Sequence, residues 1–156
     1  MTFRTTMIEH GSPEYERTIA LRELVLRKPL GLTFDPDDLA RERGDLHLAI
    51  VDEESRTLGC LVLTPEGEET IRMRQVAIDP EHQKRGLGRR LVAFSEEVAI
   101  TRGFREMTMH ARATAVPFYE RLGYTIDGEE YEEVGIPHRT MRKDLDGNRR
   151  NNERTT

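Results

Sequence analysis

The chain has 156 residues, of which 36% are hydrophobic and 34% charged, and its formal net charge is −5. This length suits one compact domain, and no apolar run reaches the roughly 18 residues that a membrane-spanning helix needs. The first residues lack the apolar stretch of a signal peptide, and a single cysteine excludes an internal disulfide. We therefore expect a cytoplasmic protein whose partners include neither a membrane nor, given the negative charge, a nucleic acid.

The chain begins with a candidate strand at residues 5–9 and two candidate helices. The run Ser12-Pro13-Glu14 is typical of a helix start, because Ser caps the helix, Pro fits its first turn and an acid favours its dipole. We expect this helix to end before Pro29, since the residue before a proline avoids helical geometry. A second, short helix is expected to begin at Asp35-Pro36.

Three apolar strands are predicted next. The runs 46–51 and 58–63 flank a turn at 52–55 and predict a hairpin, and a third strand follows at 70–78. Cys60 lies inside the second run, and we expect it to be buried and inert.

The third strand changes phase midway. Ile71 and Met73 share one face, whereas Val76 and Ile78 belong to the opposite phase. A slip of one residue inside a strand indicates a β-bulge, which we place near Gln75.

A longer helix is predicted to begin near Gly86 and to end at Gly103, which is suited to a C-terminal cap. Its apolar residues recur at helical spacing and form one stripe: Leu87, Leu91, Phe94 and Val98.

The last third of the chain predicts one short helix among strands. Met107 and Met109 are expected to point inward, and Thr114 is expected to cap a helix that ends at Gly123. The remaining strands are expected at 105–111, 124–127 and 136–141.

The order of these elements predicts an α/β (α+β) fold. We expect a mixed, mostly antiparallel sheet of six to seven strands flanked by helices, with the bulge near Gln75. Residues 1–145 are expected to form a single domain, and the polar residues 146–156 a disordered tail.

The segment Gln83-Lys84-Arg85-Gly86-Leu87-Gly88 links a predicted strand to a predicted helix. Glycines allow close approach of the backbone, and the unpaired first N–H groups of a helix attract an anion such as phosphate. A P-loop is excluded because the segment contains no Gly-Lys-Ser/Thr. A dinucleotide-binding motif is also excluded, because the segment lacks the third glycine of that motif. On these residues alone, a phosphate site and a tight turn with a solvated basic rim both remain open.

Two separated motifs resemble the GNAT superfamily of N-acetyltransferases. The run from Met73 to Pro80, followed by Gln83-x-x-Gly86-x-Gly88, is similar to the family's motif A, and Ala115 to Tyr124 is similar to its motif B. The motifs stand in the family's order and spacing. The later run Gly135-Ile136-Pro137-His138, with the acidic residues before it, resembles the ElaA/YjcF-like branch.

The resemblance implies a transferase that moves the acetyl group of acetyl-CoA to a primary amine. It also implies that the backbone of residues 76–78 pairs with the pantetheine arm and that the amides of residues 84–89 hold the pyrophosphate. The implied cofactor-binding residues are Val76, Ala77, Ile78, Gln83, Lys84, Arg85, Gly86, Leu87, Gly88, Arg89 and Tyr119.

The implied chemistry is direct attack of the amine on the thioester. The Val76 N–H is the family-based donor to the oxyanion, and Tyr119 is the family-based general acid for the leaving thiolate. An amine of pKa about 10.4 is mostly protonated at neutral pH, so a base or a water relay helps. The candidates for that base, or for the acceptor site, are His110, Glu133 and His138; Tyr119 and His138 are alternatively a core aromatic and a strand histidine.

The sequence contains opposite indications of the charge of the acceptor. The acidic run 129–133 would favour a cationic acceptor, whereas Arg72 and Arg74 would favour one with a carboxylate or phosphate. These two arginines also stand where many family members place a carboxylate base.

Two other functions are compatible with these residues. A non-catalytic module that binds acyl-CoA is the main alternative to the enzyme, and a nucleotide-phosphate binder is a weaker one. The five histidines and Cys60 show no metal-ligand spacing, so no metal is expected. The acceptor is expected to be a small-molecule or protein amine, and homodimers are common in the family.

Overall fold

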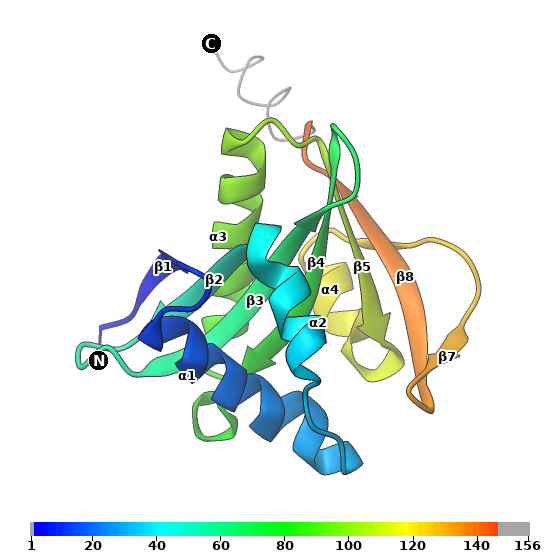
Figure 1. Cartoon of the computed structure of the whole chain (residues 1–156). Helices are drawn as coiled ribbons and strands as arrows, with labels where there is room; N and C mark the ends of the chain where they lie inside the picture. The colour runs from blue at the N-terminus through cyan, green and yellow to red at the C-terminus, as the bar shows by residue number, and fades with distance from the viewer. Residues whose placement is uncertain (1, 147–156) are drawn as a thin grey trace. The chain divides into compact units, whose positions relative to one another are not determined.

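The computed structural model describes residues 2–146 (Figure 1). The chain forms two compact units: unit 1 comprises Met1–Thr64 and Arg74–Ser95, and unit 2 comprises Pro65–Met73 and Glu96–Thr156. The single domain expected over 1–145 stays a prediction, and residues 147–156 of the expected disordered tail lie outside the described part of the chain.

The strands form one sheet in the order β1-β2-β3-β4-β5-β8-β6, with β7 paired to β8. Their bounds are β1 (Arg4–Ile8), β2 (Leu46–Val51), β3 (Thr57–Pro65), β4 (Thr70–Ile78), β5 (Glu106–Arg112), β6 (Thr125–Ile126), β7 (Tyr131–Glu133) and β8 (Ile136–Asp144). β4 and β5 run parallel, while β1, β2 and β3 and the partners of β8 pair antiparallel. The predicted fold class is confirmed, with eight strands among residues 2–146 instead of the expected six or seven.

The additional strand is β7, which contains three residues. Its sequence Tyr-Glu-Glu is short and acidic, so it carries no hydrophobic alternation that would indicate a strand. Its pairing with β8 supplies the order that its own sequence does not indicate.

In unit 1, α1 (Pro13–Arg22) begins as expected at Ser12, whose Oγ accepts a hydrogen bond from the Tyr15 N–H at 3.1 Å. The α-helix ends before Pro29 as expected, at Arg22. A π-helical turn at Glu23–Arg27 and a 3₁₀ turn at Lys28–Leu30, which contains Pro29, then follow. Pro29 fits the first turn of that 3₁₀ segment because no N–H is needed there.

A second helix, α2 (Pro36–Arg41), is capped by Asp35 and followed by a 3₁₀ turn at Glu42–Gly44. In Figure 1, α1 crosses the strands of unit 1. Leu21 of α1 packs with Cys60 of β3 and Ala77 of β4, and all three are buried. Burial raises the pKa of the Cys60 thiol to about 12, so this cysteine is the inert core residue that we expected.

β4 contains the predicted irregularity. Gln75 has a φ of 55°, which is unusual for a residue other than glycine and is found at bulges. The phase on which we based it is different, however: Ile71, Met73 and Ala77 are buried, whereas Val76 is only half-buried. The pairing of β4 with β5 ends at Met73, two residues before Gln75.

α3 (Leu87–Thr101) begins in unit 1 and ends in unit 2, where Gly103 follows with the expected positive φ of 90°. The buried stripe is rotated from the expected one. Leu87 and Leu91 are buried, but Phe94 and Val98 are half-buried, and the other buried positions are Val92, Ser95, Glu96 and Ala99.

In unit 2, Met107 and Met109 of β5 are buried as expected. The short helix α4 (Val116–Arg121) does not begin at Thr114, so that prediction is wrong. Residues 113–115 instead form a 3₁₀ turn, and the residue before α4 is Ala115, which offers no side-chain cap. Gly123 follows α4 with a φ of 95°, as expected for a C-terminal glycine.

Candidate functional site

The segment between β4 and α3 in unit 1 has the backbone of an anion site. Lys84 and Gly86 have positive φ angles of 66° and 78°, and α3 begins at Leu87. The space beside Gly86 is open, because a Cβ added there would meet no heavy atom within 4 Å. The first N–H groups of α3 therefore adjoin an unobstructed surface, where a helix favours negative charge.

The basic side chains of this segment have different roles. Arg90 already has a partner in the chain, since its Nη2 donates to the Phe3 carbonyl at 3.0 Å. Lys84, Arg85 and Arg89 are exposed and form no ion pair within residues 2–146. Three uncommitted cations thus surround the helix start and are available to a phosphate.

The end of β4 is held firmly against its neighbours in unit 1. The Asp79 N–H donates to the Leu58 carbonyl at 2.8 Å, and Gln83 Nε2 donates to the Ile78 carbonyl at 3.4 Å. Gly59 permits the close approach of the strands, because a Cβ there would lie 2.6 Å from Ile78 Cδ1. The backbone of Val76, Ala77 and Ile78 is predicted to pair with the cofactor. These contacts hold the end of that strand in a fixed position.

Tyr119 lies on α4 in unit 2 and is buried, with 7% of its surface exposed. Burial raises the pKa of its phenol to about 12, so the hydroxyl keeps its proton at neutral pH. Its ring contacts those of Phe118 and Tyr124 at centroid distances of 5.0 and 5.8 Å. Tyr124 is itself fixed, because its hydroxyl donates to the buried Glu96 carboxylate at 2.9 Å.

Unit 2 brings together the three residues proposed from the sequence as base or acceptor-site candidates. Glu133 of β7 lies between two histidines, with Oε1 3.7 Å from His110 Nδ1 and Oε2 3.4 Å from His138 Nε2. The Tyr131 ring lies near both imidazoles, at 5.8 and 6.1 Å. The strand β7 produces this cluster, because its pairing places Tyr131 opposite His138.

The two histidines differ in their hydrogen bonds. His138 Nδ1 lies 2.8 Å from the Ile136 carbonyl, which can only accept, so Nδ1 carries the proton. Arg72 Nη2 lies 3.1 Å from His110 Nδ1, and a guanidinium can only donate, so this nitrogen accepts. In the neutral state, the free lone pair of His138 is on Nε2 and faces Glu133, whereas the lone pair of His110 is already used.

The two arginines of β4 are engaged rather than free. Within unit 2, Arg72 binds His110 and lies 3.9 Å from Glu66. Within unit 1, Arg74 Nη1 donates to Thr64 Oγ1 at 3.2 Å and lies 3.6 Å from Asp45. Neither is an isolated cation, so the argument from these arginines for an anionic acceptor loses weight.

A buried ion pair in unit 1 escapes sequence analysis. Arg22 of α1 donates from Nη1 and Nη2 to the two Glu42 oxygens at 2.8 and 2.7 Å, and the Tyr15 hydroxyl donates to the same carboxylate at 2.9 Å. Burial alone would raise the pKa of Glu42, but the bonds and charge of Arg22 lower it. The partners are far apart in the chain and share no motif, so no local signal could indicate them.

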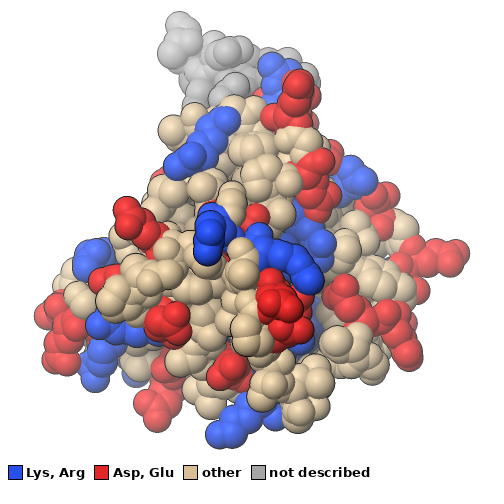
Figure 2. All heavy atoms as spheres, in the orientation of Figure 1, with Lys and Arg blue, Asp and Glu red and all other residues tan. Residues whose placement is uncertain are grey.

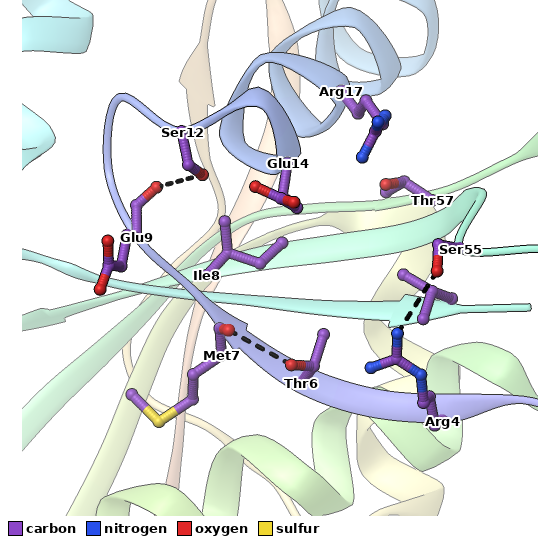
Figure 3. Close-up of a pocket in the computed structure, with 11 residues that line it drawn as sticks. Arg4, Thr6, Met7, Ile8, Glu9, Ser12, Glu14, Arg17, Ser55 and Thr57 are labelled. Atoms are coloured by element: carbon purple, nitrogen blue, oxygen red, sulfur yellow. Dashed lines mark hydrogen bonds between the residues drawn. The ribbon is translucent and has the colours of Figure 1, made fainter.

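A pocket of about 340 Å³ lies elsewhere in unit 1, against β1 and the start of α1 (Figure 3). Two hydrogen bonds join residues of its lining: Ser12 Oγ donates to the Glu9 carbonyl at 2.6 Å, and Arg4 Nη2 to Ser55 Oγ at 3.5 Å. No predicted site residue lines this pocket.

Within 2–146 there is no group of three or more side chains arranged to hold a metal ion. No helix in the same stretch has the length and apolar character to cross a bilayer.

Comparison with known families identifies the class of protein. Residues 32–145 match the family model described as "Acetyltransferase (GNAT) domain". The chain therefore belongs to the GNAT acetyltransferase family, and the resemblance carried by motifs A and B is confirmed.

Two curated relatives from Bacillus subtilis match about half of the chain. YyaT is 34% identical over 79 residues, which are 51% of this chain and 53% of YyaT. YjcF, named as an N-acetyltransferase, is 31% identical over 74 residues, which are 47% of this chain and 53% of YjcF. The chain thus spans about half the length of these relatives, and one of them belongs to the branch that the C-terminal motif resembles.

Solved structures share the fold along nearly the whole chain. A protein from Lactobacillus plantarum described as an N-acetyltransferase has a TM-score of 0.82 and 26% identity, covering 93% of this chain and 99% of its own. Escherichia coli ElaA has a TM-score of 0.77 and 18% identity, covering 92% and 100%. A GNAT acetyltransferase from Elizabethkingia anophelis with acetyl-CoA bound has a TM-score of 0.71 and 16% identity, covering 91% and 97%.

Proposed function

We propose that the protein is an acetyl-CoA-dependent N-acetyltransferase that acetylates a primary amine. The observation that carries this proposal is the anion site before α3, with its positive-φ backbone at Lys84 and Gly86 and its uncommitted cations. Family membership supports acyl transfer, and the related fold that holds acetyl-CoA supports the choice of donor.

In this proposal, the diphosphate of acetyl-CoA lies on the N–H groups from Lys84 to Arg89. The pantetheine arm pairs with the backbone of Val76, Ala77 and Ile78 in the manner of an added strand. The strand segment 76–78, which the contacts of Asp79 and Gly59 hold in place, suits this role. A fixed backbone loses little entropy when it binds an extended chain.

The chemistry begins when the neutral amine attacks the thioester carbon and forms a C–N bond. The carbonyl oxygen becomes an oxyanion, and the Val76 N–H is its proposed donor. The intermediate then expels the CoA sulfur as the C–S bond breaks, and Tyr119 donates its phenolic proton to the thiolate. A pKa of about 12 keeps Tyr119 protonated for this step and makes recovery of its proton from solvent favourable.

The proton released by the amine needs an acceptor, and His138 with Glu133 is the proposed pair. The lone pair of His138 Nε2 faces the Glu133 carboxylate at 3.4 Å. Taking up one proton replaces the repulsion of two lone pairs by an N–H to carboxylate hydrogen bond. His110 is a weaker candidate, because Arg72 already donates to its Nδ1.

The proposal also covers the setting of the enzyme. We infer a cytoplasmic protein that acts on a small-molecule or protein amine, without a membrane, nucleic acid or resident metal. Acidic and basic side chains are interspersed on the face shown in Figure 2, which gives no broad field of one sign for a polyanion. A homodimer is consistent with the family.

Calorimetric titration with acetyl-CoA, CoA and ATP tests the donor assignment. We expect acetyl-CoA and CoA to bind much more tightly than ATP, because ATP has no pantetheine arm to pair with the backbone of residues 76–78. Tighter binding of ATP would instead indicate a nucleotide-phosphate site. Tight binding of acetyl-CoA without transfer to any amine would favour the non-catalytic acyl-CoA-binding module.

A further inference from the structure

A second pocket of unit 1, of about 410 Å³, is lined by side chains from α1, the turns that follow it, α2 and β4. Its lining includes Gln75 and Arg74, the two residues directly before Val76. Consecutive Cα atoms lie about 3.8 Å apart, so the lining of this pocket comes within one residue of Val76, whose N–H is proposed to face the thioester.

Arg22 lines this pocket and has one unused donor. The residue is 1% exposed, and Glu42 accepts from both of its terminal nitrogens. Its Nε–H is buried without a hydrogen-bond partner among residues 2–146. A buried donor left unpaired costs about 1–3 kcal/mol, so a ligand that accepts from it is favoured.

Arg27 adds a guanidinium group whose edge N–H groups are free. The guanidinium groups of Arg22 and Arg27 each lie over the Phe34 ring, 4.7 Å from its centroid. Stacking uses the face of a guanidinium and leaves the N–H groups at its edge able to bind an oxyanion. Arg27 forms no ion pair with any described residue of the chain, so its charge is available.

The same pocket contains acceptors. Gln75 Oε1 is buried without a hydrogen-bond partner in the described residues, and the Asp45 carboxylate lies at the wall beside Arg74. An N–H-bearing group would satisfy Gln75. The carboxylates of Asp45 and Glu42 would also repel a dianion more strongly than a monoanion, which favours a carboxylate over a phosphate.

We propose that this pocket selects an amine acceptor that carries a carboxylate, of the amino-acid class. The carboxylate accepts from Arg22 Nε and the edge of Arg27, and an N–H of the same molecule donates to Gln75 Oε1. This inference rests on the proposed function, because it names the acceptor of that reaction. It differs from the indication of the acidic loop of unit 2, which pointed to a cationic acceptor.

Binding measured without acetyl-CoA tests the pocket separately from catalysis. The probes are the standard L-amino acids and their α-amides, titrated by calorimetry into the whole protein. A hydrogen bond to a charged group is worth about 1.5–3 kcal/mol, so the best amino acid is expected to bind at least about tenfold more tightly than its amide. O-Phosphoethanolamine, which carries a phosphate, is expected to bind more weakly than that amino acid.

Arg27→Met is the diagnostic variant, and Lys28→Met is its matched control, since Lys28 is exposed and does not line the pocket. We expect Arg27→Met to weaken the amino acid about tenfold and to leave the amide unchanged, whereas Lys28→Met changes neither. Thermal unfolding of both variants checks that they are folded.

Several results would overturn the proposal: equal affinity for acid and amide, no binding by any probe, stronger binding of the phosphate, or an unchanged Arg27→Met variant. A failure of the proposed function gives a different result. In that case the amino acid still binds with the expected selectivity, but acetyl-CoA yields no acetylated product.

Discussion

At the scale of single residues, two backbone conformations define the proposed donor site. Gln75 and Gly86 both lie in the left-handed region, with φ angles of 55° and 78°. A glycine adopts this conformation without strain, whereas for most other residues it costs about 1 kcal/mol or more. Gln75 therefore maintains a strained position directly before Val76, as is common at functional sites.

Gly86→Glu is expected to abolish binding of acetyl-CoA. The new carboxylate would place a side chain and a negative charge in the open space before α3, where the phosphates are proposed to lie. Gly67→Glu is the matched control, because Gly67 also has open space around it but no positive φ. Calorimetry is expected to show normal affinity for the control; unchanged affinity of Gly86→Glu would refute the placement of the phosphates.

Tyr119→Phe is expected to lower kcat about tenfold and to leave the affinity for acetyl-CoA unchanged. The reduction is modest because a thiolate with a pKa near 8.5 can leave partly unaided. Steady-state kinetics and calorimetry on the same preparation separate the two effects. A variant with the turnover of the wild type would remove Tyr119 from the mechanism.

At the scale of elements, the hairpin of β7 and β8 assembles the proposed base. Its turn contains Val134 and Gly135, with φ angles of 46° and 74°, and this geometry matches the twist of paired strands. The hairpin places Glu133 between His110 and His138. A three-residue strand thus contributes the only carboxylate that contacts both histidines among the residues described.

Glu133→Gln tests this hairpin. We expect kcat to fall about a hundredfold, because the neutral amide cannot stabilise a protonated His138, while affinity for acetyl-CoA is retained. Glu132→Gln is the control, since successive residues of a strand point to opposite faces. Equal kcat values for the two variants would contradict the assignment.

The extent to which the sequence predicts these elements follows from local physics. The cap at Ser12, the strand at 70–78 and the glycine after α4 depend on neighbouring residues, and the structure contains each of them. The cluster around Glu133 and the pair of Arg22 with Glu42 depend on tertiary contacts instead. The histidines and Glu133 are candidates only through the resemblance to the family. No local pattern in the sequence indicates that Arg22 is buried and paired.

At the scale of the whole molecule, stability depends on charges that are buried among apolar groups. Arg22 and Glu42 are almost fully buried and hydrogen-bonded to each other. Removing one partner of such a pair leaves a charge without compensation and costs about 3–5 kcal/mol. The pair therefore supports the fold of unit 1 as well as the proposed acceptor pocket.

Arg22→Met is accordingly expected to lower the midpoint of thermal unfolding by about 10 °C, and Arg22→Met with Glu42→Leu by much less. The double variant removes both charges, so no uncompensated carboxylate remains. Differential scanning calorimetry measures both. Equal losses in the single and double variants would show that the charge left unpaired is not the cause.

The free energy of unfolding is also expected to decrease as the pH is lowered from neutrality. Burial lowers the pKa of His47 below 6.5, so the unfolded chain takes up this proton first as the pH falls below that value. The pKa of Glu42 lies below 4.5, so its contribution is present above pH 4.5 and is lost as the pH falls through the folded value. Asp45, whose pKa burial raises, acts in the opposite sense, so chemical denaturation between pH 7 and 4 measures the balance.

The most direct test of the proposed function is mass-spectrometric detection of product from acetyl-CoA and a panel of amines. We predict an N-acetylated product and an equal amount of free CoA thiol, formed only when an amine is present and absent with Gly86→Glu. Binding of acetyl-CoA without an acetylated product from any amine in the panel would contradict the assignment as an enzyme.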